Sequence, residues 1–208
     1  MLKITPTAKS LADSPKKFTR LLLTEEPLAN HRFVESAEGT TTYKMGVGKW
    51  SKIDARSFRT IIRSIIQAAK SHKVESLAVD FSVLNFSSLK NYGESWVAST
   101  IAENFLLANY EFTTYKTGKK AKDNLKEILI TNLSSKEAIY GLKRGITLGE
   151  YTNQVRDIAN TPACDMSPTN LGDAAKRLAS GTKVQVKVLK EVDIKKLKMG
   201  ALLAVGGS

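Results

Sequence analysis

The sequence predicts an α/β protein with a mixed sheet, and two observations on its 208 residues support this fold class. Short runs rich in β-branched and aromatic residues alternate with longer segments in which apolar residues recur every three to four positions. Apolar residues make up 42% of the chain, which is enough for a buried core. We expect a small amino-terminal α/β domain at 1–132, a long connecting helix at 133–161, and the incomplete beginning of a second α/β domain at 162–208.

The first fifty residues contain two runs that are typical of strands. Phe18 to Leu23 is rich in leucine and bounded by polar residues, and Thr40 to Val47 mixes Thr, Tyr and Val before glycines interrupt it. We expect the polar segment from Glu25 to Glu38 to join these strands as a loop. The pair of glycines at Gly46 and Gly48 lacks the third glycine of a phosphate-binding fingerprint, so a turn is expected there.

A helix is expected from about Asp54 to Ser71. Its apolar residues fall on one stripe that would face a sheet, at positions 58, 61, 62, 65, 66 and 69. The segment Ser51 to Asp54 fits a capping signal at the helix start. Three arginines, at positions 56, 59 and 63, fall mostly off the stripe, so we expect water to solvate them.

Two further strands and a second helix continue this alternation. Val74 to Phe81 and Leu125 to Thr131 read as strands, and Glu94 to Tyr110 reads as a helix with one apolar face. Alternating strands and helices favour a largely parallel or mixed sheet that helices cover on its faces.

A long helix is expected from Ser134, with Ser134 or Ser135 as its cap and an apolar face running from Ala138 to Ile158 through positions 142, 151 and 155. Glycines recur every four residues within it, at positions 141, 145 and 149, and so lie in one row. Each costs about 1 kcal/mol relative to alanine inside a helix. Their absent side chains favour a tight helix contact or a domain junction, and a local break in the helix is the alternative.

Pro162 is expected to end this helix, because proline has no amide proton and disfavours helical geometry in the residue before it. The next helix should begin at Ser167 as N-cap with Pro168 at its first position, and should end at Gly181. Beyond it, valines and polar residues alternate over 183–188 as in a half-exposed strand, and 201–205 is continuously apolar as in a buried strand.

Composition limits the classes of function that are open to the chain. Apolar runs are too short for a membrane-spanning helix and no signal peptide is present, so a cytoplasmic protein is expected. The single Cys164 cannot form an internal disulfide, and the two histidines have no zinc-ligand spacing. The formal charge of +12 could favour nucleic acid, but the lysines are scattered, so nucleic-acid binding is the lesser alternative.

Several segments together resemble the leucyl (cytosol) aminopeptidase family. The signature R-x-L-x-N-x-P-x-N-x-x-x-P-x-x-L, which lies between that family's two domains, is matched by Arg156, Asn160, Pro162, Pro168 and Leu171, with Ile158 in place of Leu and Cys164 in place of the second Asn. Residues 199–206 resemble the family's M-G-x-L-L-x-V-G segment, and 102–116 resemble E-G-x-x-L-x-x-Y-x-F-x-x-Y-K, with Asn104 in place of Gly. The end of the chain, V-G-G-S, departs from the family's V-G-x-G-S.

The resemblance implies a two-metal aminopeptidase that removes amino-terminal residues from peptides and assembles as a hexamer. It implies two divalent ions, Mn or Zn, held by a Lys, three Asp and one Glu that lie outside this chain, together with a catalytic Lys and an Arg. We therefore expect no catalytic, cofactor-binding or metal-binding residue within 1–208. The carboxylates near the junction, Asp157, Asp165 and Asp173, are expected to be solvated or capping groups.

Two other functions stay open at this point. The basic α/β domain could be a non-catalytic module that binds nucleic acid. It could also only position subunits or shield an active site, in which case the glycine row would pack against a neighbouring subunit.

Overall fold

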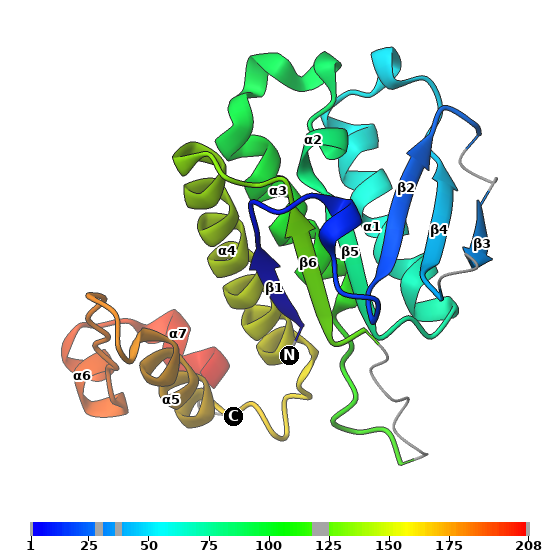
Figure 1. Ribbon diagram of the computed structural model, residues 1–208. Helices are drawn as coiled ribbons and strands as arrows, with labels where there is room; N and C mark the ends of the chain where they lie inside the picture. Colours follow the sequence, from blue (N-terminus) through cyan, green and yellow to red (C-terminus); the bar gives the residue numbers. More distant parts are fainter. Residues whose placement is uncertain (1, 28–30, 36–38, 118–124, 207–208) are drawn as a thin grey trace. The chain divides into compact units, whose positions relative to one another are not determined.

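The computed structural model describes residues 2–27, 31–35, 39–117 and 125–206 (Figure 1). The chain divides into two compact units, Met1–Asn153 and Gln154–Ser208, which are described separately below. The first unit contains strands β1 (Lys3–Pro6), β2 (Thr19–Thr24), β3 (His31–Glu35), β4 (Thr41–Gly46), β5 (Ser76–Asp80) and β6 (Glu127–Thr131). Its helices are α1 (Ala55–Ser71), α2 (Phe81–Leu84), α3 (Gly93–Asn109) and most of α4 (Lys136–Asn160), with short 3-10 turns η1 (Leu11–Asp13), η2 (Trp50–Lys52) and η3 (Ser87–Tyr92).

The strands form one mixed sheet in the order β1-β6-β5-β2-β4-β3, in which β3 alone is antiparallel to its neighbour. The four predicted strands are present as β2, β4, β5 and β6. The prediction of a continuous loop from Glu25 to Glu38 is wrong, because β3 forms within it. Phe33 of β3 lies opposite Tyr43 of β4 with ring centroids 4.6 Å apart, and such aromatic pairs stabilise adjacent strands. The edge strand β1 was not predicted either.

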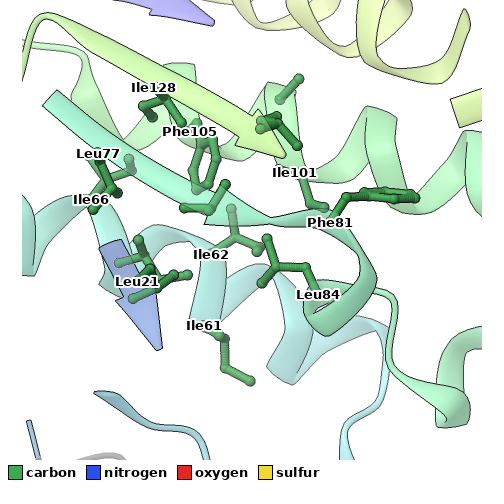
Figure 2. Packing of buried hydrophobic residues seen from close by; sticks show 14 of the residues in the cluster. Leu21, Ile61, Ile62, Ile66, Leu77, Phe81, Leu84, Ile101, Phe105 and Ile128 are labelled. Atoms are coloured by element: carbon green, nitrogen blue, oxygen red, sulfur yellow. The ribbon is translucent and has the colours of Figure 1, made fainter. Parts of the chain in front are cut away.

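The core lies between one face of the sheet and the helices α1 and α3 (Figures 1 and 2). Along β2, Leu21 and Leu23 are buried against the helices, whereas Leu22 between them is 41% exposed on the other face. On that other face the turn η1 approaches β5, where Ala78 is fully buried. The expectation that helices would cover both faces is therefore wrong, since α1 and α3 pack side by side on the same one.

Helix α1 buries the stripe predicted for it, namely Phe58, Ile61, Ile62, Ile65, Ile66 and Ala69. Two of its three arginines are not merely solvated as expected. The guanidinium of Arg59 lies over the ring of Trp96 at 5.5 Å, and Arg63 Nε donates a 2.7 Å hydrogen bond to Asn104 Oδ1. Lys70 Nζ approaches a carbonyl oxygen in the last turn of α3 at 3.5 Å. These side chains join α1 to α3 and help to satisfy the carboxyl end of α3.

Asp54 caps α1 and should make the stability of the first unit depend on pH. Its Oδ1 accepts hydrogen bonds from Ser57 Oγ at 2.6 Å and from Ser57 N at 2.7 Å, and these bonds lower the pKa of the Asp54 carboxyl below its ordinary value. A lowered pKa in the folded state gives stability that is present above the unfolded-state pKa and is lost as pH falls through the folded-state pKa. We expect the midpoint temperature of thermal unfolding to decrease as the pH is lowered from about 5 to about 3.

The variant Asp54→Asn is the control for this prediction, because its carboxamide still caps the helix but does not titrate over that range. We expect its unfolding midpoint to fall less on acidification than that of the unchanged protein. Equal slopes for the two proteins in calorimetry at matched pH values would contradict an electrostatic role for Asp54.

The glycine row of α4 packs directly on α3. A Cβ atom placed on Gly141 would lie 2.1 Å from the carbonyl oxygen of Ser95, and one on Gly145 would lie 2.2 Å from that of Ser99. Both glycines are buried, and α4 continues through them without interruption. The row is therefore the tight helix contact that was expected, and the alternative of a break in the helix is wrong. The row packs on α3 of the same chain. The hypothesis that the chain only positions subunits had placed it against a neighbouring subunit.

The third glycine of the row faces a side chain, whereas the first two face backbone atoms. A Cβ atom on Gly149 would lie 2.8 Å from the nearest atom, which belongs to the side chain of Leu106. One turn further along α4, Asn153 Nδ2 donates a 3.1 Å hydrogen bond to the Leu106 carbonyl oxygen. Because Gly141 faces Ser95, Gly145 faces Ser99 and Gly149 faces Leu106, the two helices run in the same direction along this contact.

The beginning of α4 agrees with the predicted cap, since Ser135 Oγ accepts a 3.1 Å hydrogen bond from Ala138 N. Ala138 is also buried, as its place on the apolar face predicts. Farther along, the predicted face is not buried: Tyr151 is 39% exposed and Val155 is 54% exposed. The side of α4 that contacts α3 is the side that carries the glycines. The predicted apolar face therefore does not make this contact.

The second unit contains the end of α4 and three helices, α5 (Pro168–Ala179), α6 (Glu191–Lys196) and α7 (Gly200–Gly206). The helix predicted to begin at Ser167 is α5. The strand predictions for 183–188 and 201–205 are wrong in this structure, because 184–190 has no regular secondary structure and 201–205 lies in α7. A strand needs a neighbouring strand with which to form its backbone hydrogen bonds. The Ala and Leu residues of 201–205 favour a helix, in which these bonds form within the segment itself.

Candidate functional site

The turn between α4 and α5 carries the motif that the sequence singled out, and it is built from local hydrogen bonds. Thr161 N and Thr161 Oγ1 both donate to the Asp157 carbonyl oxygen, at 3.1 and 2.7 Å. The Pro162 carbonyl oxygen accepts from the amides of Asp165 and Met166, each at 2.9 Å. Helix α4 therefore ends just before the proline, as predicted.

The start of α5 is held in the same way. Ser167 Oγ accepts a 3.2 Å hydrogen bond from Asn170 N, and Pro168 occupies the first helical position, where no amide proton is needed. Asn170 Nδ2 also reaches back to the Asp165 carbonyl oxygen at 2.9 Å. This network fixes the direction in which α5 leaves the turn.

A cavity of about 350 Å³ lies between the end of α4 and α5 within the second unit. Its lining combines apolar and polar side chains: Gln154, Asp157, Ile158, Thr161, Met166, Ala174, Arg177 and Leu178. Asp157 and Arg177 give it one carboxylate and one guanidinium. Its lining contains no histidine or cysteine. The sequence predicted the helices that form this cavity but did not single out Arg177, whose position in a last helical turn is common for basic residues.

The three aspartates near the turn do not lie together as the ligands of a metal centre would. Asp157 lines the cavity, Asp165 lies in the turn, and Asp173 Oδ1 is 3.5 Å from Lys176 Nζ on α5. Over 2–27, 31–35, 39–117 and 125–206, no three His, Cys, Asp or Glu side chains are grouped as a metal ion requires. The residues present therefore do not fit a two-metal site, which needs clustered carboxylates. Cys164 is a free, exposed thiol.

Positive charge is spread over both units. Lysines at 44, 49, 52 and 126 belong to the first unit and those from 183 to 198 to the second, while Lys119, Lys120 and Lys122 lie outside the described residues. Lys17 contacts Glu127 at 2.5 Å, and its hydrogen bond holds the pKa of the Glu127 carboxyl below the usual range. Within the described part, none of the helices is both long and apolar enough to cross a membrane.

Two family models match the chain. The model for the N-terminal domain of the cytosol aminopeptidase family matches residues 43–119, and the model for the catalytic domain of the same family matches residues 153–208. Together the two matches cover more than half of the 208 residues. The second match begins in the last turns of α4, so it includes the α4–α5 turn and the cavity.

Curated relatives match along most of the chain. A probable cytosol aminopeptidase of Roseiflexus castenholzii is 30% identical over 166 residues, which are 78% of this chain and 33% of that protein. A probable cytosol aminopeptidase of Solibacter usitatus is 31% identical over 170 residues, which are 80% of this chain and 33% of that protein. The chain thus spans about a third of the length of the curated relatives it matches.

Solved structures support the fold. A mutant tomato leucine aminopeptidase superposes with a TM-score of 0.79 at 20% identity, over 99% of this chain and 48% of that one. The bottromycin maturation enzyme BotP in complex with Mn superposes with a TM-score of 0.72 at 19% identity, over 92% of this chain and 42% of that one. At these identities the likeness concerns the fold alone.

Proposed function

The chain belongs to the cytosol aminopeptidase family, and from this premise we propose that it forms the amino-terminal part of a metal-dependent aminopeptidase. The reaction would be hydrolysis of the first peptide bond of a peptide, with leucine among the residues released. The observation that carries the proposal is the order of the two family matches, in which a catalytic-domain match follows the amino-terminal domain along one chain. A cytoplasmic location and a hexameric assembly are further parts of the proposal, and they rest on the resemblance.

The two divalent ions of the proposed enzyme, Mn or Zn, would polarise the scissile carbonyl and activate a water molecule. The described residues of this chain do not fit that site, so no step of the reaction is assigned to them. The contribution of this chain is structural in the proposal. Its first unit is a folded α/β domain, and its second unit supplies the α4–α5 turn and the first helices of the catalytic domain.

The purified 208-residue chain is expected to show no hydrolysis of leucine p-nitroanilide with added Mn²⁺ or Zn²⁺. The reason is that the ligands which a two-metal site requires are not grouped among its described residues. The measurement is release of p-nitroaniline, with the full-length Roseiflexus castenholzii relative as positive control. That relative should lose activity with EDTA and regain it with Mn²⁺. Metal-dependent turnover by the purified 208-residue chain would contradict the expectation that this chain alone is inactive.

One alternative is supported by a specific observation, namely the formal charge of +12. A non-catalytic basic module that binds nucleic acid would use this charge, and its affinity would fall steeply with salt as counterions compete for the phosphates. The family matches favour the aminopeptidase, because they account for both units of the chain.

A further inference from the structure

Helix α1 carries basic side chains without an acidic counterpart. Its 17 residues contain no Asp or Glu, and its basic residues are Arg56, Arg59, Arg63 and Lys70. Their helical spacing places all four along one side of α1, and three of them contact α3, which lies beside α1 (Figure 1). Lys70 forms an ion pair with Glu111, whereas no carboxylate of the described residues pairs with the three arginines. These exposed arginines, called the arginine row below, therefore keep their positive charge unneutralised.

One member of the arginine row, Arg63, is held in place by a buried amide. Its Nε donates a 2.7 Å hydrogen bond to Asn104 Oδ1, and Asn104 Nδ2 donates in turn to the Thr100 carbonyl oxygen at 2.8 Å. Asn104 is 1% exposed, so these two bonds fix the direction of the guanidinium. The other N–H groups of Arg63 have no partner within the part of the chain that the structure describes, and an anion can bind to them.

Two aromatic rings lie beside the arginine row, at the start of α3. The rings of Tyr92 and Trp96 are stacked with their centroids 4.3 Å apart, and the guanidinium of Arg59 lies 5.5 Å from the centroid of the Trp96 ring. Tyr92 is 50% exposed. Because the Trp96 ring orients it, Tyr92 presents a fixed aromatic surface to the solvent. A flat ring of a ligand can therefore stack on Tyr92 next to the arginine row.

The arginine row and the exposed ring of Tyr92 together indicate the chemical class of a ligand. Guanidinium groups without an acidic partner bind phosphates, and exposed aromatic rings stack on bases that are not paired in a duplex. Arg59 and Arg63 are about 6 Å apart along the helix axis, so neighbouring phosphates of one strand can contact both. We infer that this face of the first unit binds single-stranded nucleic acid, with a base stacked on Tyr92 and phosphates on the arginine row. The inference does not depend on the proposed function, because it needs neither the metal ions nor the second unit.

The test is fluorescence anisotropy of a labelled oligothymidylate of about twelve nucleotides, titrated with the 208-residue chain at about 50 mM salt. We expect saturable binding of the single strand and weaker binding of a duplex of the same length. Inorganic polyphosphate, which carries the charge without bases, should compete about fivefold less well than unlabelled oligothymidylate at equal phosphate concentration. Equal binding of the duplex or equal competition by polyphosphate would overturn the inference. Equal competition by thymidine monophosphate would also overturn it, because a free nucleotide would then be the ligand.

Charge variants test the arginine row. We expect Arg56→Gln and Arg63→Gln each to weaken oligothymidylate binding by about fivefold and to reduce the slope of log affinity against log salt by about 0.7, the value for one phosphate contact to a single strand. The side chain of Arg56 has no contact to lose among the described residues, so unfolding cannot explain its effect. Arg144→Gln removes an exposed arginine from α4 and should change the affinity by about twofold at most. Equal effects of Arg56→Gln and Arg144→Gln would show that the arginine row is not the site.

A pair of tyrosine variants tests the stacking of a base. Tyr92→Leu removes the exposed ring and should weaken oligothymidylate binding by about fivefold or more, but it should leave the salt slope unchanged because no charge is lost. Tyr140→Leu is the matched control, since Tyr140 is an exposed tyrosine of α4, and it should leave both quantities unchanged. If the Tyr92→Leu protein binds as tightly as the Tyr140→Leu protein, no base stacks on Tyr92 and the inference is wrong.

Discussion

Replacement of Gly145 by alanine is expected to lower the free energy of unfolding of the first unit by about 3 kcal/mol, and replacement by leucine to prevent its folding. The new Cβ atom would lie 2.2 Å from the Ser99 carbonyl oxygen and 2.8 Å from its Cα, so α3 and α4 would have to move apart. The gain in helix propensity from glycine to alanine, about 1 kcal/mol, is smaller than this overlap. Urea unfolding followed by tryptophan fluorescence would measure the loss, because Trp96 lies on α3.

Two matched variants on the same helix are the controls. Gly149→Ala should cost less than Gly145→Ala, since its nearest neighbour is the side chain of Leu106, which can change rotamer. Lys143→Ala, at an exposed position, should change stability by less than about 0.5 kcal/mol. Equal effects of Gly145→Ala and Lys143→Ala would show that α3 and α4 are not in close contact. A change of sedimentation without loss of stability would instead support contact between subunits.

Phe105→Ala is expected to destabilise the first unit by about 4 kcal/mol. The Phe105 side chain is fully buried between α3 and the sheet, near Ile101 of the same helix and Ile128 of β6 (Figure 2). Its removal would leave a cavity that the rigid sheet cannot close, so the cost includes lost contacts as well as lost apolar burial. Thermal or urea unfolding of the purified variant would measure the change.

Leu22→Ala is the control for this variant. Leu22 is 41% exposed on the opposite face of the sheet, and we expect its loss to cost less than about 1 kcal/mol. A cost for Leu22→Ala close to that for Phe105→Ala would mean that both faces of the sheet are covered in solution. The same result would contradict the one-sided arrangement of α1 and α3.

Elements with a strong periodic pattern were predictable from the sequence. Helix α1 follows from six apolar residues at helical spacing, and α5 follows from Ser167 and Pro168 together with its stripe. Strand β3 was not predictable, because its five residues include His, Arg and Glu and gain their place only by pairing with β4. Such tertiary contacts leave no periodic signal in the segment itself.

Around the α4–α5 turn, the sequence located the helix end at Pro162 and the cap at Ser167, because both effects act within a few residues. It did not locate the cavity, which depends on how two helices approach each other. The segment at 201–205 shows the opposite failure. Its apolar run predicts a buried strand, but among the residues described here no strand pairs with it, and it forms a helix.

The three glycines of α4 also bear on how the chain folds. Relative to alanine they cost the isolated helix about 3 kcal/mol in total, so α4 has little tendency to form before it docks. Docking needs a formed α3, whose serine-lined surface provides the groove for the glycines. We therefore expect α4 to form after the folding transition state, so that substitutions in α4 have φ-values near 0. We also expect α4 to unfold together with α3 and the sheet in one cooperative transition.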